Sequence, residues 1–129
     1  MKKIVALRAA ICALNTEDDI KKQVCSAYNL LLGENNLPES DIISLVFSVT
    51  GDLTAINPAS ALRKSGLGAG LVLFCVQEPN TSGMLPRTIR LLLHCYMEEG
   101  AKPHHVYTGG AEVLRPDRGG MEQKPPAVC

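Results

Sequence analysis

The sequence from Thr16 to Gly33 reads TEDDIKKQVCSAYNLLLG, and it predicts one long helix. Thr16 and Asp19 resemble a capping box, and the acidic residues of the first turn complement the positive end of the helix dipole. Gly33 predicts the C-terminal stop. The apolar residues repeat at helical spacing, so they form one face that we expect to cover a sheet. They are Ile20, Val24, Ala27, Tyr28 and Leu31.

Strand-like segments lie on both sides of this helix. Residues 3–12 precede it and are apolar, with enough β-branched side chains for a first strand. Residues 42–50 are rich in Ile, Val and Phe and predict a buried strand. Pro58 opens a short helix, since proline is tolerated best at the first helical position. Residues 71–76 then predict a third strand.

The second half of the chain has a less defined pattern. Residues 87–97 fit either a helix or a strand on periodicity alone. Residues 105–108 and 112–114 are candidates for short strands. The end of the chain is polar, aperiodic and rich in Gly and Pro. We therefore expect residues 1–117 to form a single domain and residues 118–129 to form a flexible C-terminal tail.

The order of these elements predicts an α+β fold, a mixed β-sheet with one long helix that covers mainly one side. A sheet of this kind leaves its other face without a cover. Because the predicted strands are rich in apolar residues, we expect a homo-oligomer to bury that face.

Composition and charge exclude several classes of protein. The chain has 129 residues, of which 46% are hydrophobic and 20% charged, which fits one globular domain with a real core. Thirteen Lys and Arg balance thirteen Asp and Glu, which argues against a nucleic-acid partner. No segment approaches the roughly 20 apolar residues that span a bilayer. Five cysteines without Cys-x-x-Cys spacing do not fit a secreted disulfide framework, so we expect a soluble cytoplasmic protein with no membrane partner.

Three sequence features could indicate a phosphate-binding loop, a zinc site or a nucleophilic cysteine, but the residues around them do not support these functions. Gly66, Gly68 and Gly70 precede a strand, whereas a phosphate-binding loop follows a strand and opens a helix. The histidines lack the convergent short spacing of a zinc site, so we expect no metal. Cys75 lies in an apolar strand without an assignable His and acid partner, which favours packing over nucleophilic catalysis.

Charged residues inside apolar segments give a stronger signal, because a buried charge is costly. Arg8 interrupts the first predicted strand and Glu78 follows the third. Arg90 lies within the apolar segment 87–97, and Arg115 ends the last predicted strand. Taken singly, each fits a surface residue or an internal ion pair. Together they also fit a pocket for a small dicarboxylate, because guanidinium binds carboxylate through two hydrogen bonds.

Short motifs from Leu7 to Asp117 form an ordered set. They are Arg8, NTEDDI (15–20), SVTGDL (48–53), Pro58-Ala59, ALR (61–63), CVQE (75–78), LPRTIR (85–90), HVY (105–107) and VLRPD (113–117). With this set at these spacings, the sequence resembles the small monofunctional chorismate mutases of the trimeric, sheet-rich class. No single motif carries the resemblance, whereas the ordered set is specific.

The resemblance implies the conversion of chorismate to prephenate on the route to phenylalanine and tyrosine. This reaction is a Claisen rearrangement of one substrate and needs no nucleophile, no proton transfer and no cofactor. The implied fold is a homotrimeric pseudo α/β-barrel with active sites between subunits, in which residues 87–97 are a strand. That assembly agrees with the uncovered sheet face predicted above.

The resemblance assigns catalytic roles to Arg90, Glu78 and Cys75. Arg90 matches the arginine that hydrogen-bonds the ether oxygen of the breaking C–O bond. Glu78 and the neighbourhood of Cys75 match the groups that hold the ring hydroxyl. Arg8 and Tyr107 match residues that bind the substrate carboxylates.

Further positions match the mouth and the walls of the family's pocket. Arg63 and Arg115 match mobile cations near the mouth. The wall positions are Ala59, the backbone from Leu73 through Phe74 to Cys75, and Leu114 as an apolar wall.

Three positions depart from the family pattern. Asn57 occurs where the family often has Phe, and Ser60 occurs where it often has Lys. The missing cation weakens capture of a dianion unless nearby Lys64 replaces it. Phe74 occurs where a smaller polar residue is common.

Two hypotheses from different classes follow. The first is an isomerase, supported by the presence of Arg8, Cys75, Glu78, Arg90 and Tyr107. The alternative is a non-catalytic trimeric binding module for a small dicarboxylate, which the departures at two pocket positions favour. A plain interaction domain with surface arginines fits the embedded charges least well.

Overall fold

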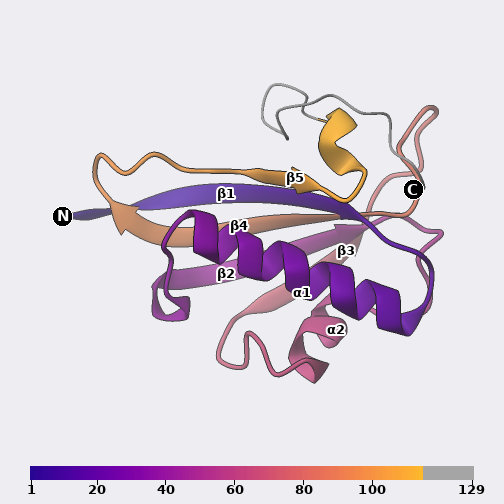
Figure 1. Cartoon of the computed structure of the whole chain (residues 1–129), viewed down its shortest axis with the longest axis horizontal. Coiled ribbons are helices and arrows are strands. Elements are labelled where there is room, and N and C mark those ends of the chain that lie inside the picture. Colours follow the sequence, from indigo (N-terminus) through magenta and orange to yellow (C-terminus); the bar gives the residue numbers. More distant parts are fainter. Residues whose placement is uncertain (115–129) are drawn as a thin grey trace.

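The chain forms a five-stranded sheet with two α-helices, in a computed structural model that describes residues 1–114 (Figure 1). The strand order in the sheet is β3-β2-β4-β1-β5. The elements are β1 (Lys2–Cys12), α1 (Glu17–Glu34), the 3-10 turn η1 (Glu39–Asp41), β2 (Ile42–Val49), α2 (Pro58–Lys64), β3 (Leu73–Gln77), β4 (Thr88–Glu98), β5 (Val106–Thr108) and the 3-10 turn η2 (Ala111–Leu114). Arg115 and the predicted tail at 118–129 lie outside the described residues, as does the predicted domain end at residue 117.

The sheet is mixed, which confirms the predicted α+β class. The central strand β4 pairs antiparallel with β1 on one side and with β2 on the other. The outer strands pair in parallel, β5 with β1 and β3 with β2. The segment 87–97, which periodicity left open, is therefore the strand β4, as the resemblance implied.

The helix α1 begins as its sequence predicts. The Thr16 hydroxyl oxygen accepts a hydrogen bond from the Asp19 backbone N–H at 3.1 Å, and all five predicted apolar residues are buried. The prediction that Gly33 ends the helix is wrong by a short distance. The helix runs to Glu34, because Asn35 caps it and Asn36 supplies the left-handed turn with a φ of 48°.

The hydroxyl of Tyr28, on the buried face of α1, connects the helix to the rest of the structure. It donates a hydrogen bond to the carboxylate of Glu39 in η1, and this carboxylate also accepts from the Gly68 backbone N–H at 3.2 Å. Burial, together with the hydrogen bond to Glu39, raises the pKa of Tyr28, so its hydroxyl stays protonated. The contact joins α1, η1 and the loop that follows α2.

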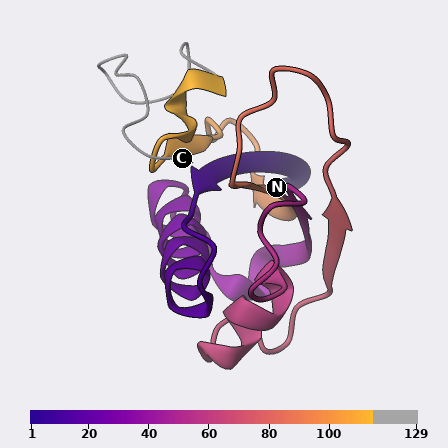
Figure 2. The same cartoon turned by 90° about the vertical axis from the view of Figure 1, so that its right-hand side faces the viewer.

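The hydrophobic core lies between the two helices and one face of the sheet (Figure 2). Alternate residues of each strand point toward the helices, as period-2 alternation requires. Fully or almost fully buried side chains from β1, β2 and β4 meet the apolar face of α1 there. They include Leu7, Ile11, Leu45, Phe47, Ile89, Leu91 and Leu93.

The opposite face of the sheet carries little cover within the described residues. A small second cluster lies at the β1–β5 end, where η2 packs over Ala10, Cys12 and Tyr107. Elsewhere large apolar side chains remain exposed, and Phe74 is 63% exposed. We call this surface the open face. It is formed by Ile4, Arg8, Val46, Ser48, Phe74, Val76, Arg90, Leu92 and Tyr96.

One predicted element is wrong. Residues 112–114 were expected to form a short strand, but Ala111–Leu114 is the 3-10 turn η2. The cause lies just before it, where Gly109 and Gly110 both have positive φ angles (62° and 102°) and turn the chain away from the sheet. The turn places Leu114 over the open face instead of in a strand.

Candidate active site

A cavity of about 380 Å³ lies on the open face, between the sheet and η2. Four residues predicted as site residues line it: Arg8, Arg90, Tyr107 and Leu114. The remaining walls are mainly apolar and come from Val46, Val76, Leu91 and Leu92, while Ser48 adds a hydroxyl. Two cations in a largely apolar hollow suit a small ligand that has carboxylates and a carbon ring.

The strand register brings the two arginines together. Arg90 on β4 lies directly opposite Ala10 on β1, which is two residues from Arg8 and points to the same face. Tyr107 on β5 also lies opposite Ala10, in the parallel pairing. Three polar side chains from three adjacent strands therefore converge on the same region of the sheet, and the backbone ladder fixes their spacing.

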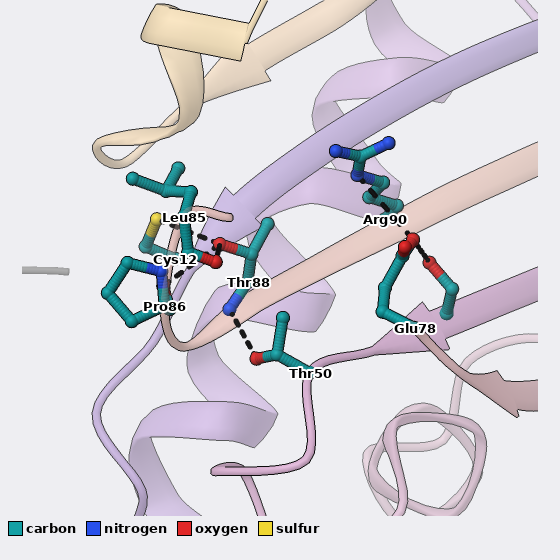
Figure 3. A network of polar contacts seen from close by, with 8 residues as sticks. Cys12, Thr50, Glu78, Leu85, Pro86, Thr88 and Arg90 are labelled. Atoms are coloured by element: carbon teal, nitrogen blue, oxygen red, sulfur yellow. Dashed lines mark hydrogen bonds and ion pairs between the residues drawn. The ribbon is translucent and has the colours of Figure 1, made fainter. Parts of the chain in front are cut away.

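Glu78 lies beside Arg90, at the edge of this cavity. Its Oε1 is 3.6 Å from Arg90 Nε, and the two side chains point toward each other (Figure 3). The Oε1 also accepts a hydrogen bond from Ser48 Oγ at 2.5 Å. Glu78 and Arg90 also line a smaller hollow of about 60 Å³, together with Thr50 and Thr88. Glu78 and Arg90, both predicted as catalytic residues, are therefore neighbours in the structure.

A polar corner at the end of β2 fixes the start of β4. Thr50 Oγ1 accepts from the Thr88 backbone N–H at 2.9 Å (Figure 3). The same hydroxyl donates to Asp52 Oδ1 at 2.6 Å. The Asp52 carboxylate also accepts from the Arg87 backbone N–H at 3.0 and 3.2 Å. Arg87 has a φ of +47°, which is unfavourable for a side chain of this size, and the hydrogen bonds hold it there. This corner holds the backbone of Arg87 and Thr88, just before Arg90 on the same strand.

Comparison with known proteins identifies the family. The family model "Chorismate mutase type I" matches residues 4–118, which is most of the chain. The chain belongs to this family. Its activity is that of a chorismate mutase, which makes it an isomerase.

Individual relatives agree with this assignment. The chain is 29% identical over 104 residues to chorismate mutase AroH of Bacillus subtilis, covering 80% of this chain and 82% of that protein. It is 33% identical over 111 residues to chorismate mutase AroH of Thermus thermophilus, covering 81% and 90%. A solved chorismate mutase from Clostridium thermocellum superposes with a TM-score of 0.77 at 36% identity, covering 85% of this chain and 99% of that one.

Cys75 and Leu73 point away from the cavity of this chorismate mutase. Both are partly buried and pack against the core on the helix side, because they alternate along β3 with the outward-facing Phe74 and Val76. Burial raises the pKa of the Cys75 thiol, so the sulfur stays protonated and is a weak donor rather than a nucleophile. Phe74 reaches the open face but does not line the cavity, whereas Val76 does.

The four predicted residues of α2 do not join the cavity of their own chain. Asn57 and Arg63 are exposed and Ser60 is partly exposed, while Ala59 is buried in the core on the helix side of the sheet. Asn57 has a structural role that the sequence analysis missed, because its Oδ1 caps α2 by accepting from the Ala59 N–H at 2.8 Å. An Asn directly before a helix-opening Pro is the signal that predicts such a cap.

Lys64 is the residue expected to compensate for the missing lysine at position 60. Its Nζ lies 3.9 Å from Glu17 Oε1 on α1. Both side chains are more than half exposed, so the pair is weak and Lys64 remains available to other anions.

Ser48 lines the cavity but is not among the residues predicted from the sequence. The motif SVTGDL contributed to the resemblance, but no role was given to its first residue. Its position two residues after Val46 on β2 places it on the open face, so alternation along β2 was a usable signal.

The described residues meet the requirements of neither a metal centre nor a membrane-spanning helix. Within residues 1–114, no cluster of three or more His, Cys, Asp or Glu side chains has the arrangement needed to hold a metal ion. Over the same range, no helix combines the length and the apolar character needed to cross a bilayer.

Proposed function

We propose that the cavity on the open face is the site at which chorismate is converted to prephenate. The observation that carries this proposal is the convergence of Arg8 and Arg90 on one cavity, with Glu78 paired to Arg90 at its edge. Chorismate is a dianion with a carbon ring and a ring hydroxyl. The two arginines supply cations for the carboxylates and the ether oxygen, and the apolar walls contact the ring.

The chemistry requires orientation and charge stabilisation. In the rearrangement the ether C–O bond breaks as a C–C bond forms within the same molecule, and no proton is transferred. The substrate must first adopt a compact chair, which a shaped cavity with fixed anion binders favours. Negative charge develops on the ether oxygen as the bond opens. A fixed guanidinium at that oxygen stabilises the transition state more than the ground state.

The pairing of Glu78 with Arg90 supports separate roles for the two side chains in binding the substrate. Glu78 contacts Nε of the guanidinium, which leaves the two terminal nitrogens of Arg90 for the substrate. We assign Glu78 to accept a hydrogen bond from the ring hydroxyl, as the resemblance implies. Arg8 and Tyr107 are assigned to the carboxylates. Cys75 remains a predicted contributor to hydroxyl binding.

The site is proposed to be completed by a second copy of the chain in a homotrimer. Two observations support this assembly: the exposed apolar side chains of the open face and the position of α2 on the other side of the sheet from the cavity. In the trimer, Arg63, Ser60 and Asn57 of one subunit are assigned to the cavity of its neighbour, whereas Ala59 is buried in the core of its own chain. Arg115 lies outside the described residues and remains a substrate-binding residue implied by the resemblance.

The trimer gives the first testable prediction. We expect light scattering at micromolar concentration to give three times the chain mass of 13.8 kDa. Phe74→Glu places a charge on the open face, and we expect it to shift the mass to that of a monomer, because burying an unpaired charge is costly. Leu30→Glu is the matched control, since Leu30 is an exposed apolar residue on the outer side of α1. A monomeric parent chain, or equal dissociation of both variants, would contradict the proposed assembly.

The second prediction concerns Arg8. A carboxylate contact exists in the ground state and in the transition state alike, so Arg8→Ala should act mainly on binding. We expect steady-state kinetics to show that KM rises by about 10-fold or more, which corresponds to the loss of a charge-assisted hydrogen bond. The rise in KM should be at least as large as the fall in kcat. Lys3→Ala, an exposed cation on the same strand outside the cavity, should leave both constants unchanged. A native KM in Arg8→Ala would remove Arg8 from the site.

The cellular role follows from the activity. A chorismate mutase supplies prephenate for the synthesis of phenylalanine and tyrosine, and this role is shared by the family. We propose a cytoplasmic location, where the soluble substrate of this pathway would be available.

A further inference from the structure

We propose that Ser48 is a positioning residue that holds the Glu78 carboxylate ready for the substrate. This inference rests on the role proposed above for Glu78 as the acceptor of the ring hydroxyl. Ser48 lines the cavity, and its Oγ lies 2.5 Å from Glu78 Oε1. The Ser48 hydroxyl donates this hydrogen bond, and the Glu78 carboxylate oxygen accepts it.

The backbone brings the two residues together but leaves the glutamate side chain undetermined. Ser48 on β2 lies opposite Arg90 on β4, and the Glu78 backbone N–H donates to the Val49 carbonyl oxygen at 2.9 Å. Glu78, Ser48 and Arg90 therefore lie side by side across three neighbouring chain segments. A glutamate has three rotatable side-chain bonds, so a fixed Cα does not by itself fix the carboxylate. A further contact is needed to hold it.

Ser48 is the stronger of the two contacts that hold the carboxylate. The Arg90 side chain is 51% exposed, and its Nε is 3.6 Å from Oε1, so this ion pair is screened by water and weak. The contact from Ser48 is a direct hydrogen bond from a hydroxyl to a carboxylate oxygen, which makes it stronger and more directional than the ion pair. Within residues 1–114, both contacts of the carboxylate go to Oε1. Oε2 is therefore left to accept the substrate hydroxyl.

The composition of β2 supports a specific use for the hydroxyl. The strand reads IISLVFSV, and a valine at position 48 would suit the sheet at least as well as serine. The other serine of the strand, Ser44, is a natural control. It lies on the same strand outside the cavity, and its Oγ is 3.3 Å from His94 Nδ1. Removing either hydroxyl changes the strand to a similar degree, but only Ser48 contacts Glu78.

The test is a set of steady-state kinetic measurements with chorismate on the full chain. Ser48→Ala should lower kcat/KM by about 10- to 100-fold, the range expected when a charge-assisted hydrogen bond is lost and a reacting group is misplaced. Ser48→Thr keeps the hydroxyl and suits a strand, so it should stay within about threefold of the parent. Ser44→Ala should match the parent.

A double-mutant cycle separates positioning from direct contact with the substrate. If Ser48 acts through Glu78, adding Ser48→Ala to Glu78→Ala should change kcat/KM by less than about twofold. If the loss from Ser48→Ala persists in full in the Glu78→Ala background, Ser48 contacts the substrate itself and the proposal is overturned. A native rate for Ser48→Ala beside a slow Glu78→Ala overturns it too, while leaving the role of Glu78 intact. A native rate for Glu78→Ala removes both roles.

A crystal structure of each variant gives a readout that does not depend on turnover. The Glu78 carboxylate should occupy its parent position in Ser48→Thr and should leave it, or become disordered, in Ser48→Ala. A carboxylate that keeps its place in Ser48→Ala would show that Arg90 and the backbone suffice to hold it, which contradicts the proposal.

Discussion

We expect Arg90→Lys to lower kcat by roughly 10²–10³-fold, the usual cost of removing one well-placed donor to a developing oxyanion. The effect on KM should be much smaller, because Arg8 and Tyr107 line the same cavity and still bind the carboxylates. Lysine keeps the positive charge but loses the planar fork, and its single nitrogen cannot contact both Glu78 and the ether oxygen in the same geometry. Steady-state kinetics with chorismate measures both constants.

The comparison with Arg8→Ala makes this result specific. Both substitutions remove a guanidinium from one cavity, but Arg90→Lys should act on kcat and Arg8→Ala on KM. A circular dichroism spectrum and a mass identical to the parent would show that the fold is intact. If Arg90→Lys then turned over chorismate at a native rate, Arg90 would not be the group that stabilises the ether oxygen.

The largest effect on stability is expected from Phe47→Ala. Phe47 is fully buried in β2, between β3 and β4, and faces the helix-side core. Truncating a buried phenylalanine removes its burial and leaves a cavity, which costs roughly 3–5 kcal/mol of the free energy of unfolding. Phe47 also lies between Val46 and Ser48, so the substitution loosens the strand that carries two cavity residues.

Urea unfolding checks this prediction, with all variants at the same chain concentration because an oligomer's stability depends on concentration. Leu30→Ala is the control: Leu30 is 40% exposed on α1, so its loss should change the unfolding free energy by about 0.5 kcal/mol or less. A Phe47→Ala variant with less than about 1 kcal/mol of destabilisation would show that the core tolerates the gap by collapsing.

Local signals predicted the local elements of this fold. The capping threonine, the acidic first turn and the five apolar residues of α1 all act within a few residues of one another, and each prediction for them is confirmed. The conformation of β4 could not be predicted from such local signals. Its sequence TIRLLLHCYME interrupts the alternation with three leucines, and its conformation is set by pairing with β1 and β2, which are distant in the sequence.

Local signals in the sequence indicated some of the residues that line the cavity and not others. Arg8 and Arg90 stood out because each interrupts an apolar run, and the register of β1 and β4 then brings them to one cavity. Alternation along β2 places Ser48 on the open face, but its hydrogen bond goes to Glu78, 30 positions later, and no local pattern predicts that contact. The error at η2 has a local origin, since the two glycines before it turn the chain where its composition still favours a strand.

The position of β1 in the sheet has a consequence for the synthesis of the protein. The ribosome makes β1 before the other strands, but both neighbours of β1 in the sheet, β4 and β5, are made last. Leu7 cannot pair with Leu93, nor Ala9 with Val106, until those later residues have been synthesised. Until those residues leave the ribosome, both edges of an apolar strand lack partners and are prone to pair with other chains. We therefore expect a growing chain of this protein to be most prone to aggregation before β4 emerges. A chain cut before β5 would keep Arg90 but lack Tyr107 and Leu114 from its cavity.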